Sequence, residues 1–158
     1  MSLSPQPARF SQAEQINIVM SGHINGAGRL FGGILVEWID VVAAVAARRH
    51  SGCDVTTAAI DNLQFKSPAY AGDTVILNAR LTYAGRTSME VRVDTYVESL
   101  QGARRLINTA YLVMVALDAK GNPAPVPPLQ IETEEQKLEY EAAALRKELR
   151  KKRRAQGY

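Results

Sequence analysis

The stretch HINGAGRLFGGILVEWIDVVAAVAARR, from His23 to Arg49, decides the fold. It opens with a glycine-rich turn and enters an apolar run from Ile34 to Ala47 that only Glu37 and Asp40 interrupt. A helix that is apolar on nearly every side is expected to be buried inside a domain. The pattern therefore predicts a buried helix over about 34–49.

The end of this helix carries its own signals. Gly52 is a typical stop, because glycine readily adopts the left-handed conformation that ends helices. Arg48, Arg49 and His50 come just before it, where cations suit the negative end of the helix dipole. We interpret these three residues as structural.

The start of the helix combines groups that can do chemistry. Its first turn has free backbone N–H groups, and Gly32 and Gly33 let a ligand approach them closely, so a carbonyl oxygen can be held as it becomes an oxyanion. An ionised carboxylate is costly to bury, so Asp40 needs hydrogen bonds, water or a raised pKa. It can act as a base on water or attack an acyl carbon. Asn25 has a donor and an acceptor to orient that water or polarise the acyl oxygen, and Glu37 is a reserve base.

Composition restricts the class of protein. The 158 residues, 46% hydrophobic and 22% charged, fit one soluble domain with a real core. A net charge of +3 does not argue for a nucleic-acid partner. One cysteine excludes an internal disulfide and fits a reducing cytosol, and two histidines and one cysteine at unrelated spacings form no metal-ligand set. With no signal-peptide pattern and no apolar run long enough to span a bilayer, we expect a cytoplasmic protein without membrane insertion.

The hydrophobic period changes after the helix. Four runs with strand-like alternation are separated by short turns, and a shorter run precedes the helix. One long helix followed by such strands predicts an α+β domain with an antiparallel sheet wrapped over a central helix. The expected strands are Gln15–Met20, Val55–Phe65, Thr74–Tyr83, Ser88–Val97 and Arg105–Leu117, after a loose lead-in over Met1–Arg9.

The last part of the chain has a different character. Pro123–Pro128 is a stiff connector, and Thr133–Gln136 has the form of a capping box that opens a helix to about Arg154. Its acids come early and its bases late, which suits a solvated or packing helix, although the basic end also suits a phosphorylated ligand or an acidic neighbouring subunit. We divide the chain into a domain over 1–122 and a connector with a charged helix over 123–158.

Several motifs together resemble one family. The run Asn25–Gly33 followed by Asp40 resembles the signature of hotdog-fold acyl-CoA thioesterases of the cytosolic acyl-CoA hydrolase type. The segment Thr57–Asp61, with the turn at Gly72-Asp73 after it, is similar to that family's second strand, and Gly85–Ser88 to its Gly-x-Thr-Ser turn. The resemblance covers about residues 15–117.

The resemblance implies a hotdog fold, in which the helix lies inside a curled sheet and two domains pair edge to edge around the active site. It implies hydrolysis of acyl-CoA thioesters without a metal or cofactor, coenzyme A being part of the substrate. An asparagine at the position of Asn25 and an aspartate at that of Asp40, from opposite subunits, then carry the chemistry. We expect a homodimer that assembles further, to a hexamer. One departure is His23, where such members often have an acid.

Further roles follow for substrate binding. We expect the Gly33 N–H to stabilise the oxyanion and Gly32 to contact the substrate. The nucleotide part of coenzyme A has four candidate ligands among charged and hydroxyl residues in loops, namely Lys66, Arg86, Thr87 and Ser88.

Two other functions stay open on the sequence. His23 and Glu37, with Gly26 between them, have a spacing that resembles the hotdog 3-hydroxyacyl-thioester dehydratases, whose acid and base remove water from the substrate. That motif's prolines are absent, and Asn25 and Asp40 would have no role in it. The third possibility is a sensor that binds acyl-CoA and leaves it intact.

Overall fold

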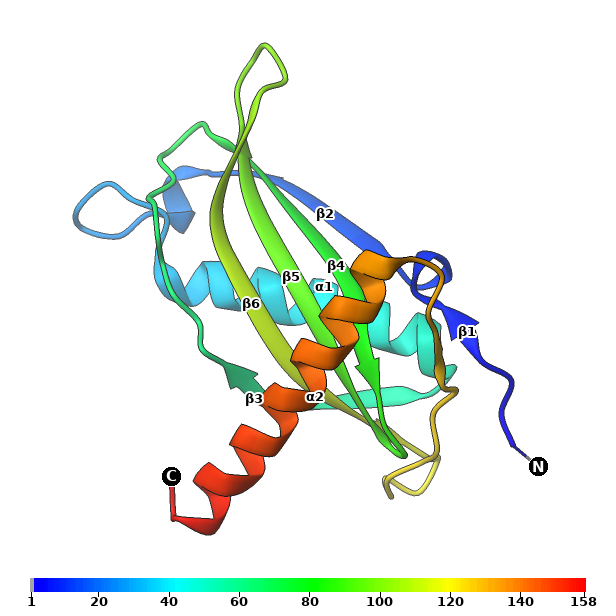
Figure 1. Ribbon diagram of the computed structural model, residues 1–158. Helices are drawn as coiled ribbons and strands as arrows, with labels where there is room; N and C mark the ends of the chain where they lie inside the picture. Colours follow the sequence, from blue (N-terminus) through cyan, green and yellow to red (C-terminus); the bar gives the residue numbers. More distant parts are fainter. Residues whose placement is uncertain (1) are drawn as a thin grey trace.

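A computed structural model describes residues 2–158, and Figure 1 shows the long helix α1 behind a strongly curved antiparallel sheet. The sheet contains five strands in the order β2-β4-β5-β6-β3, so β2 and β3 form its two edges. The α+β class and the curled sheet around a long helix are as predicted. The elements are β2 (Ala13–Ile18), α1 (Gly32–Ser51), β3 (Asp54–Asp61), β4 (Thr74–Ala84), β5 (Ser88–Glu98), β6 (Arg104–Leu117) and α2 (Glu134–Ala155), with a short 3-10 helix η2 (Ser21–His23) before α1.

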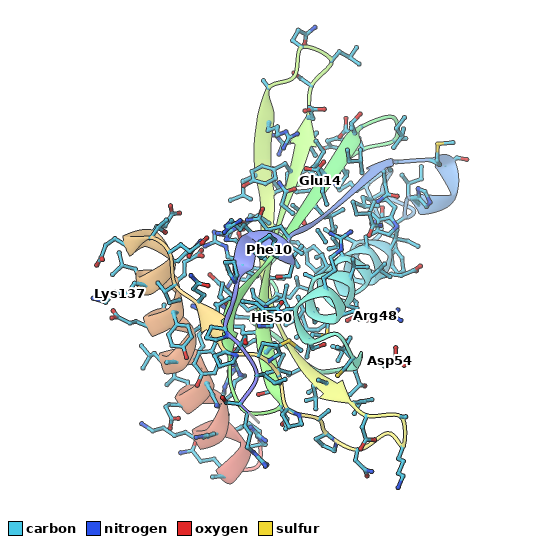
Figure 2. The ribbon with its side chains drawn as sticks, turned by 90° about the vertical axis from the view of Figure 1, so that its right-hand side faces the viewer. Phe10, Glu14, Arg48, His50, Asp54 and Lys137 are labelled. Atoms are coloured by element: carbon cyan, nitrogen blue, oxygen red, sulfur yellow. The ribbon has the colours of Figure 1, made fainter. Side chains whose placement is uncertain are left out.

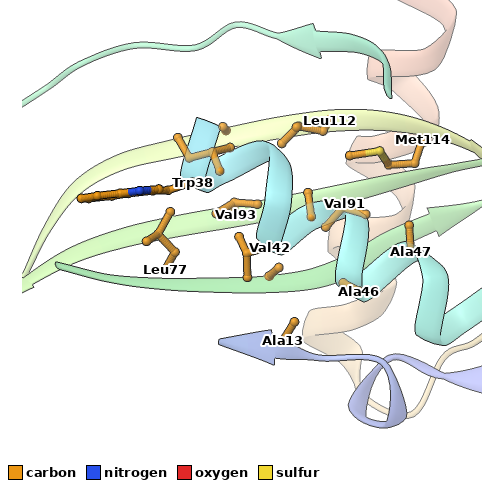
Figure 3. Packing of buried hydrophobic residues seen from close by; sticks show 14 of the residues in the cluster. Ala13, Trp38, Val42, Ala46, Ala47, Leu77, Val91, Val93, Leu112 and Met114 are labelled. Atoms are coloured by element: carbon orange, nitrogen blue, oxygen red, sulfur yellow. The ribbon is translucent and has the colours of Figure 1, made fainter. Parts of the chain in front are cut away.

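The core fills the space between α1 and the concave face of the sheet. On the helix, Trp38, Val42 and Ala46 follow one another at four-residue spacing and face the sheet (Figure 3). Leu77 of β4 and Leu112 of β6 are among the fully buried residues that meet them. The small alanines in the second half of α1 let the sheet approach the helix closely.

One side of α1 is not covered within the protomer. Phe31 before the helix is 53% exposed and Val41 is 51% exposed, although both are apolar. Glu37, predicted to be as buried as Asp40, is exposed, and Asp40 is half-buried. The prediction of burial on nearly every side is therefore wrong for a single chain, because the sheet covers only its concave side.

The C-terminal end of α1 is partly as predicted. Gly52 ends the helix with φ +68°, and Arg48 pairs with Asp54 at 3.1 Å. The prediction that His50 is a cation at this end is wrong. Its ring is 1% exposed, and burial lowers its pKa despite the hydrogen bond between Nε2 and the Pro127 carbonyl at 2.9 Å. His50 is therefore a neutral core residue that anchors the proline connector.

Two segment boundaries differ from the prediction. β3 ends at Asp61 instead of Phe65, because Asn62 has φ +52° and turns the chain out of the strand. The predicted loose lead-in over Met1–Arg9 is ordered from residue 2, the first that the structure describes. β1 (Gln6–Pro7) pairs with β7 (Leu129–Gln130), and the 3-10 helix η1 (Ala8–Phe10) follows. The proline connector and the N-terminal segment thus hold each other.

Helix α2 covers the convex face of the sheet, on the side opposite α1 (Figure 2). Thr133 is the N-cap as predicted, because its hydroxyl accepts a hydrogen bond from the Gln136 N–H at 3.1 Å. The capping box is only half formed, since the Gln136 side chain accepts from the Glu132 N–H at 2.8 Å and not from Thr133. Only Ala143 of the helix is fully buried. Ion pairs hold the helix on the sheet and its other side is exposed, in agreement with the predicted solvated or packing helix. The position of the domain boundary stays a prediction.

The arginines of α2 pair with two buried acids of the sheet. Glu90, 1% exposed, accepts hydrogen bonds from Arg146 at 2.6 Å and from Arg150 at 3.0 Å. Asp61 accepts from Arg150 at 3.1 Å and from Arg153 at 2.9 Å. Burial alone would raise the pKa of Asp61, but these two arginines together hold it below its usual value. Arginines in the basic half of α2 therefore neutralise buried acids of the sheet in the same chain.

Candidate active site

The predicted base Asp40 is held by a residue that the sequence did not single out as functional. The Thr57 hydroxyl on β3 donates a hydrogen bond to Oδ1 of Asp40 at 2.6 Å, and its oxygen lies 3.4 Å from the sulfur of Met114. Within residues 2–158 no group hydrogen-bonds to Oδ2 of Asp40. One carboxylate oxygen is thus fixed while the other is open to water or substrate. Thr57 begins the segment Thr57–Asp61 of the family resemblance, which was the available signal.

Asn25 lies in the glycine-rich turn and organises it. Its side-chain Oδ1 accepts hydrogen bonds from the backbone N–H groups of Ala27 at 2.9 Å and Arg29 at 3.2 Å. The acceptor side of the amide is therefore occupied by the loop itself. The NH₂ group is left to donate, and the residue is exposed. Of the two roles predicted for Asn25, this geometry favours polarising the acyl oxygen through the NH₂ group over orienting water through the amide oxygen.

Gly32 and Gly33 begin the first turn of α1. Phe31 is the N-cap residue, and its side chain makes no capping hydrogen bond. No hydrogen bond among the described residues uses their backbone N–H groups, as the geometry of a helix start requires. Both positions are also sterically tight. A Cβ on Gly33 would lie 2.7 Å from the Phe31 ring, and one on Gly32 would lie 3.3 Å from the Phe65 ring. A larger residue at either position would thus have to displace a phenylalanine ring, and the glycine N–H groups remain available to an oxyanion.

A cavity of about 320 Å³ brings part of the predicted set together. Asn25, Gly32 and Lys66 line it, with Phe65 and Leu35 on the apolar side. Asp40 does not line this cavity, and no hydrogen bond among residues 2–158 joins it to Asn25. Within one protomer the two predicted catalytic side chains are therefore separate.

The other predicted nucleotide ligands lie at the opposite end of the sheet, Arg86 and Thr87 in the turn between β4 and β5 and Ser88 at the start of β5. The backbone carbonyls of Arg86 and Thr87 accept hydrogen bonds from Val126 and Ala116 at 3.0 Å, which fixes the turn. Ser88 opens into a second cavity of about 490 Å³. This cavity is also lined by three arginines of α2, namely Arg150, Arg153 and Arg154. The protomer does not bring this turn near Lys66.

The groups needed for a dehydratase are not assembled. His23 accepts a hydrogen bond at Nδ1 from the Met20 N–H at 3.0 Å, and its ring stands edge-on to Trp38 at 5.1 Å. Glu37 is exposed, and among residues 2–158 no hydrogen bond or ion pair joins it to His23. His23 therefore has a structural explanation. The part of the chain that the structure describes also holds no group of three or more side chains able to bind a metal. In residues 2–158 no helix meets the length and hydropathy needed to span a bilayer.

The fold and the site define a hotdog thioesterase, and comparison with known proteins agrees. The family model of the thioesterase superfamily matches residues 27–102. The acyl-CoA thioester hydrolase YkhA of Bacillus subtilis, itself uncharacterized, is 40% identical over 131 residues, which cover 82% of this chain and 76% of YkhA. The human cytosolic acyl coenzyme A thioester hydrolase is 31% identical over 145 residues, covering 88% of this chain but 38% of that protein. The chain belongs to the acyl-CoA thioester hydrolases of this superfamily.

Solved structures extend the match to nearly the full chain. An apo-hexameric acyl-CoA thioesterase is 42% identical, with a TM-score of 0.92 over 97% of this chain and 99% of its own. The acyl-CoA hydrolase of Staphylococcus aureus, solved with butyryl coenzyme A and coenzyme A, is 34% identical with a TM-score of 0.90 over 96% and 93%. The predicted hotdog fold and family are thereby confirmed.

The S. aureus hydrolase has also been solved with single alanine substitutions of an asparagine, an aspartate and a threonine. In that chain the asparagine precedes the aspartate by 15 residues, and the threonine follows the aspartate by 17. Asn25, Asp40 and Thr57 have the same order and spacing here, 15 (40 − 25) and 17 (57 − 40) residues.

Proposed function

We propose that the protein hydrolyses acyl-CoA thioesters to a free acid and coenzyme A, with Asp40 activating the water. The observation that carries this proposal is the Asp40 carboxylate, fixed at Oδ1 by Thr57 and open at Oδ2. A general base must reach the water it deprotonates, and an unoccupied oxygen beside a helix face permits that. The names of the relatives and the matched spacing with the S. aureus hydrolase support the same chemistry.

The complete site is proposed to form between two protomers. β3 is a free edge of the sheet, and such an edge presents unpaired N–H and C=O groups to a second strand. The exposed apolar residues Phe31 and Val41 lie on the uncovered side of α1. Antiparallel pairing of β3 with the same strand of a second copy would cover that side. It would also place Asn25 of the partner subunit opposite Asp40. The partner would then supply the amide group that does not reach Asp40 within one chain.

In the proposed reaction, Oδ2 of Asp40 takes a proton from water while the water oxygen bonds to the thioester carbon. The carbonyl oxygen becomes an oxyanion that accepts hydrogen bonds from the Gly33 N–H and the partner's Asn25 amide. When the tetrahedral intermediate collapses, the C–S bond breaks and the thiolate of coenzyme A takes up the proton. Direct attack by Asp40 on the acyl carbon uses the same open oxygen and is the alternative first step.

The same pairing of β3 strands would bring the predicted nucleotide ligands of two protomers close together. Ser88 lies at the level of Val115 in the sheet, which pairs with Thr56 of β3. Lys66 lies at the level of Ile107, toward the other end. A two-fold axis across β3 exchanges these ends, so the partner's Lys66 would approach the turn Arg86–Ser88. We propose that the phosphates of coenzyme A bind there, and that the dimer assembles to a hexamer in the cytosol, as the names of relatives suggest.

A panel of acyl-CoAs with different chain lengths, followed by free-thiol detection, tests the function. We expect thiol release that needs no added metal or cofactor. A dehydratase would instead convert 3-hydroxyacyl-CoA to an enoyl thioester with its own absorbance and no thiol. A sensor would bind acyl-CoA and return it intact after hours. Either of these results would contradict the proposal.

Thr57 provides a separate prediction for the same site. Thr57→Val removes a hydrogen bond to a charged group while keeping the volume, which corresponds to a loss in kcat of about 10- to 100-fold. Thr57→Ser keeps the hydroxyl and should stay within a few-fold of wild type. Steady-state rates on one acyl-CoA at saturating concentration check this. Equal rates for Thr57→Val and Thr57→Ser would show that the hydroxyl does not position Asp40.

A further inference from the structure

The outer side of α2 carries an apolar stripe that its own protomer does not cover. Leu138, Leu145 and Leu149 are 60%, 63% and 48% exposed, and Ala142 between them is also exposed. These four residues, here called the α2 seam, are spaced by four, three and four positions. That is the spacing of the apolar positions along one face of a coiled-coil helix. In Figure 1 this helix crosses the front of the sheet.

The seam is distinct from the side that attaches α2 to the sheet. Attachment uses Glu139, Ala143, Arg146 and Arg150, which contact sheet residues or are buried. On a helical wheel these positions lie about 70° to 130° away from the centre of the seam, with a mean direction about 100° from it. The seam therefore does not serve to pack α2 within its own domain, and its exposure needs another explanation.

Charge along α2 indicates what fits the seam. Glu134 and Glu135 stand in the first turn of the 22-residue helix, and Lys152 and Arg153 in the last turn. A second copy of α2 lying antiparallel would set its basic end against the acidic end of the first, and the reverse at the other end. The surface is thus complementary to itself under a two-fold rotation, as an interface between identical chains must be.

We propose that α2 pairs antiparallel with α2 of a second copy of this chain through the α2 seam. Symmetry fixes the register. Leu138 packs against the partner's Leu149, Ala142 against the partner's Leu145, and Glu135 faces the partner's Lys152. Alanine near the centre lets the two helices approach closely there, while leucines fill both sides.

This interface differs from the proposed β3 pairing. β3 is an edge of the sheet, whereas α2 lies on its convex face, so the two surfaces face in different directions (Figure 2). Two different two-fold interfaces on one chain join dimers into a larger closed assembly. The inference does not depend on the proposed reaction, because the assembly is measured without substrate.

Substitution of the seam tests the inference. Leu145→Glu/Leu149→Glu places two carboxylates of each copy in the apolar contact, and sedimentation velocity should show the wild-type assembly reduced to dimers. The matched control is Lys137→Gln/Lys151→Gln, which changes the net charge equally on other sides of the exposed helix. Far-UV circular dichroism verifies that α2 is retained. A wild-type dimer, or the same mass for both double variants, would overturn the inference.

A charge exchange tests the register. Glu135→Lys and Lys152→Glu should each weaken association by about tenfold at low salt, since each pair occurs twice in a symmetric interface. The combination Glu135→Lys/Lys152→Glu restores opposite charges and should return the dissociation constant to near the wild-type value. If the combined variant is weaker than both single ones, the antiparallel register is wrong.

Discussion

Asp40→Asn should lower kcat for acyl-CoA hydrolysis by about 10²- to 10⁴-fold, the contribution of a positioned general base. Asparagine keeps the shape of the side chain and its hydrogen bond from Thr57, which lies at 2.6 Å in the wild type. What it lacks is the negative charge and the basicity at the second oxygen. The KM should change little, because the substitution removes an interaction of the transition state and leaves substrate contacts in place.

The control for Asp40 is the other acid of the same helix. Glu37→Gln should keep activity within a few-fold of wild type, because Glu37 is exposed and hydrogen-bonds to no described group. Sedimentation of both variants establishes that assembly is unchanged. If Asp40→Asn turns over at the wild-type rate, or Glu37→Gln is the inactive variant, Asp40 is not the base.

Glu90→Ala should destabilise the protein by about 3–5 kcal/mol, the range for removing one partner of a buried ion pair. Glu90 is 1% exposed and neutralises Arg146 and Arg150, which also bring α2 to the sheet. Without it, two guanidinium groups and the Thr82 hydroxyl lose their shared acceptor. Because α2 buries only Ala143 completely, apolar packing offers little compensation.

The matched control for Glu90 lies on α2 itself. Glu148 pairs with Lys151 at 3.0 Å, but both side chains are more than half exposed. Glu148→Ala should leave the urea midpoint unchanged, since water replaces an exposed partner. Both variants are compared with wild type at one protein concentration, because assembly contributes to stability. Equal midpoints for Glu90→Ala and Glu148→Ala would show that the network under α2 is not important for stability.

Much of the fold follows from local patterns. The apolar run after Gly33 and the period-two alternation in the later strands each record how one element meets the core. Gly52 and Thr133 mark helix ends through their own backbone and side-chain chemistry. Signals of this kind need no knowledge of distant parts of the chain, and these elements were predicted within a few residues of their bounds.

Properties that depend on a distant partner were not predictable. The position of His50 at the helix end predicts a cation, but its ring lies in the core and hydrogen-bonds to the Pro127 carbonyl, 77 residues away. The apolar pattern predicts a buried Glu37, but Glu37 is exposed, because the sequence does not show which side of α1 the sheet leaves open. The basic residues late in α2 do not indicate by themselves that they form ion pairs with Asp61 and Glu90 of the sheet.

The same limit applies to the candidate site. Asn25, Gly33 and Asp40 could be named because the glycine turn and the helix that carry them are contiguous. Thr57 was missed as a functional residue, because its hydroxyl meets Asp40 only through the packing of β3 against α1. Lys66 and the turn Arg86–Ser88 were predicted to bind one ligand, yet they lie at opposite ends of the protomer, so that prediction depends on the proposed pairing with a second chain.

The claim that each site uses Asp40 of one subunit and Asn25 of the other is tested most directly by mixing two inactive variants. Asp40→Ala and Asn25→Ala are dissociated together, reassociated, and assayed for thiol release. In a mixed dimer one of the two sites regains both native residues, so random pairing should restore about a quarter of the wild-type rate. If each site were built within one chain, the mixture would stay as inactive as its components, and the proposed site between subunits would be wrong.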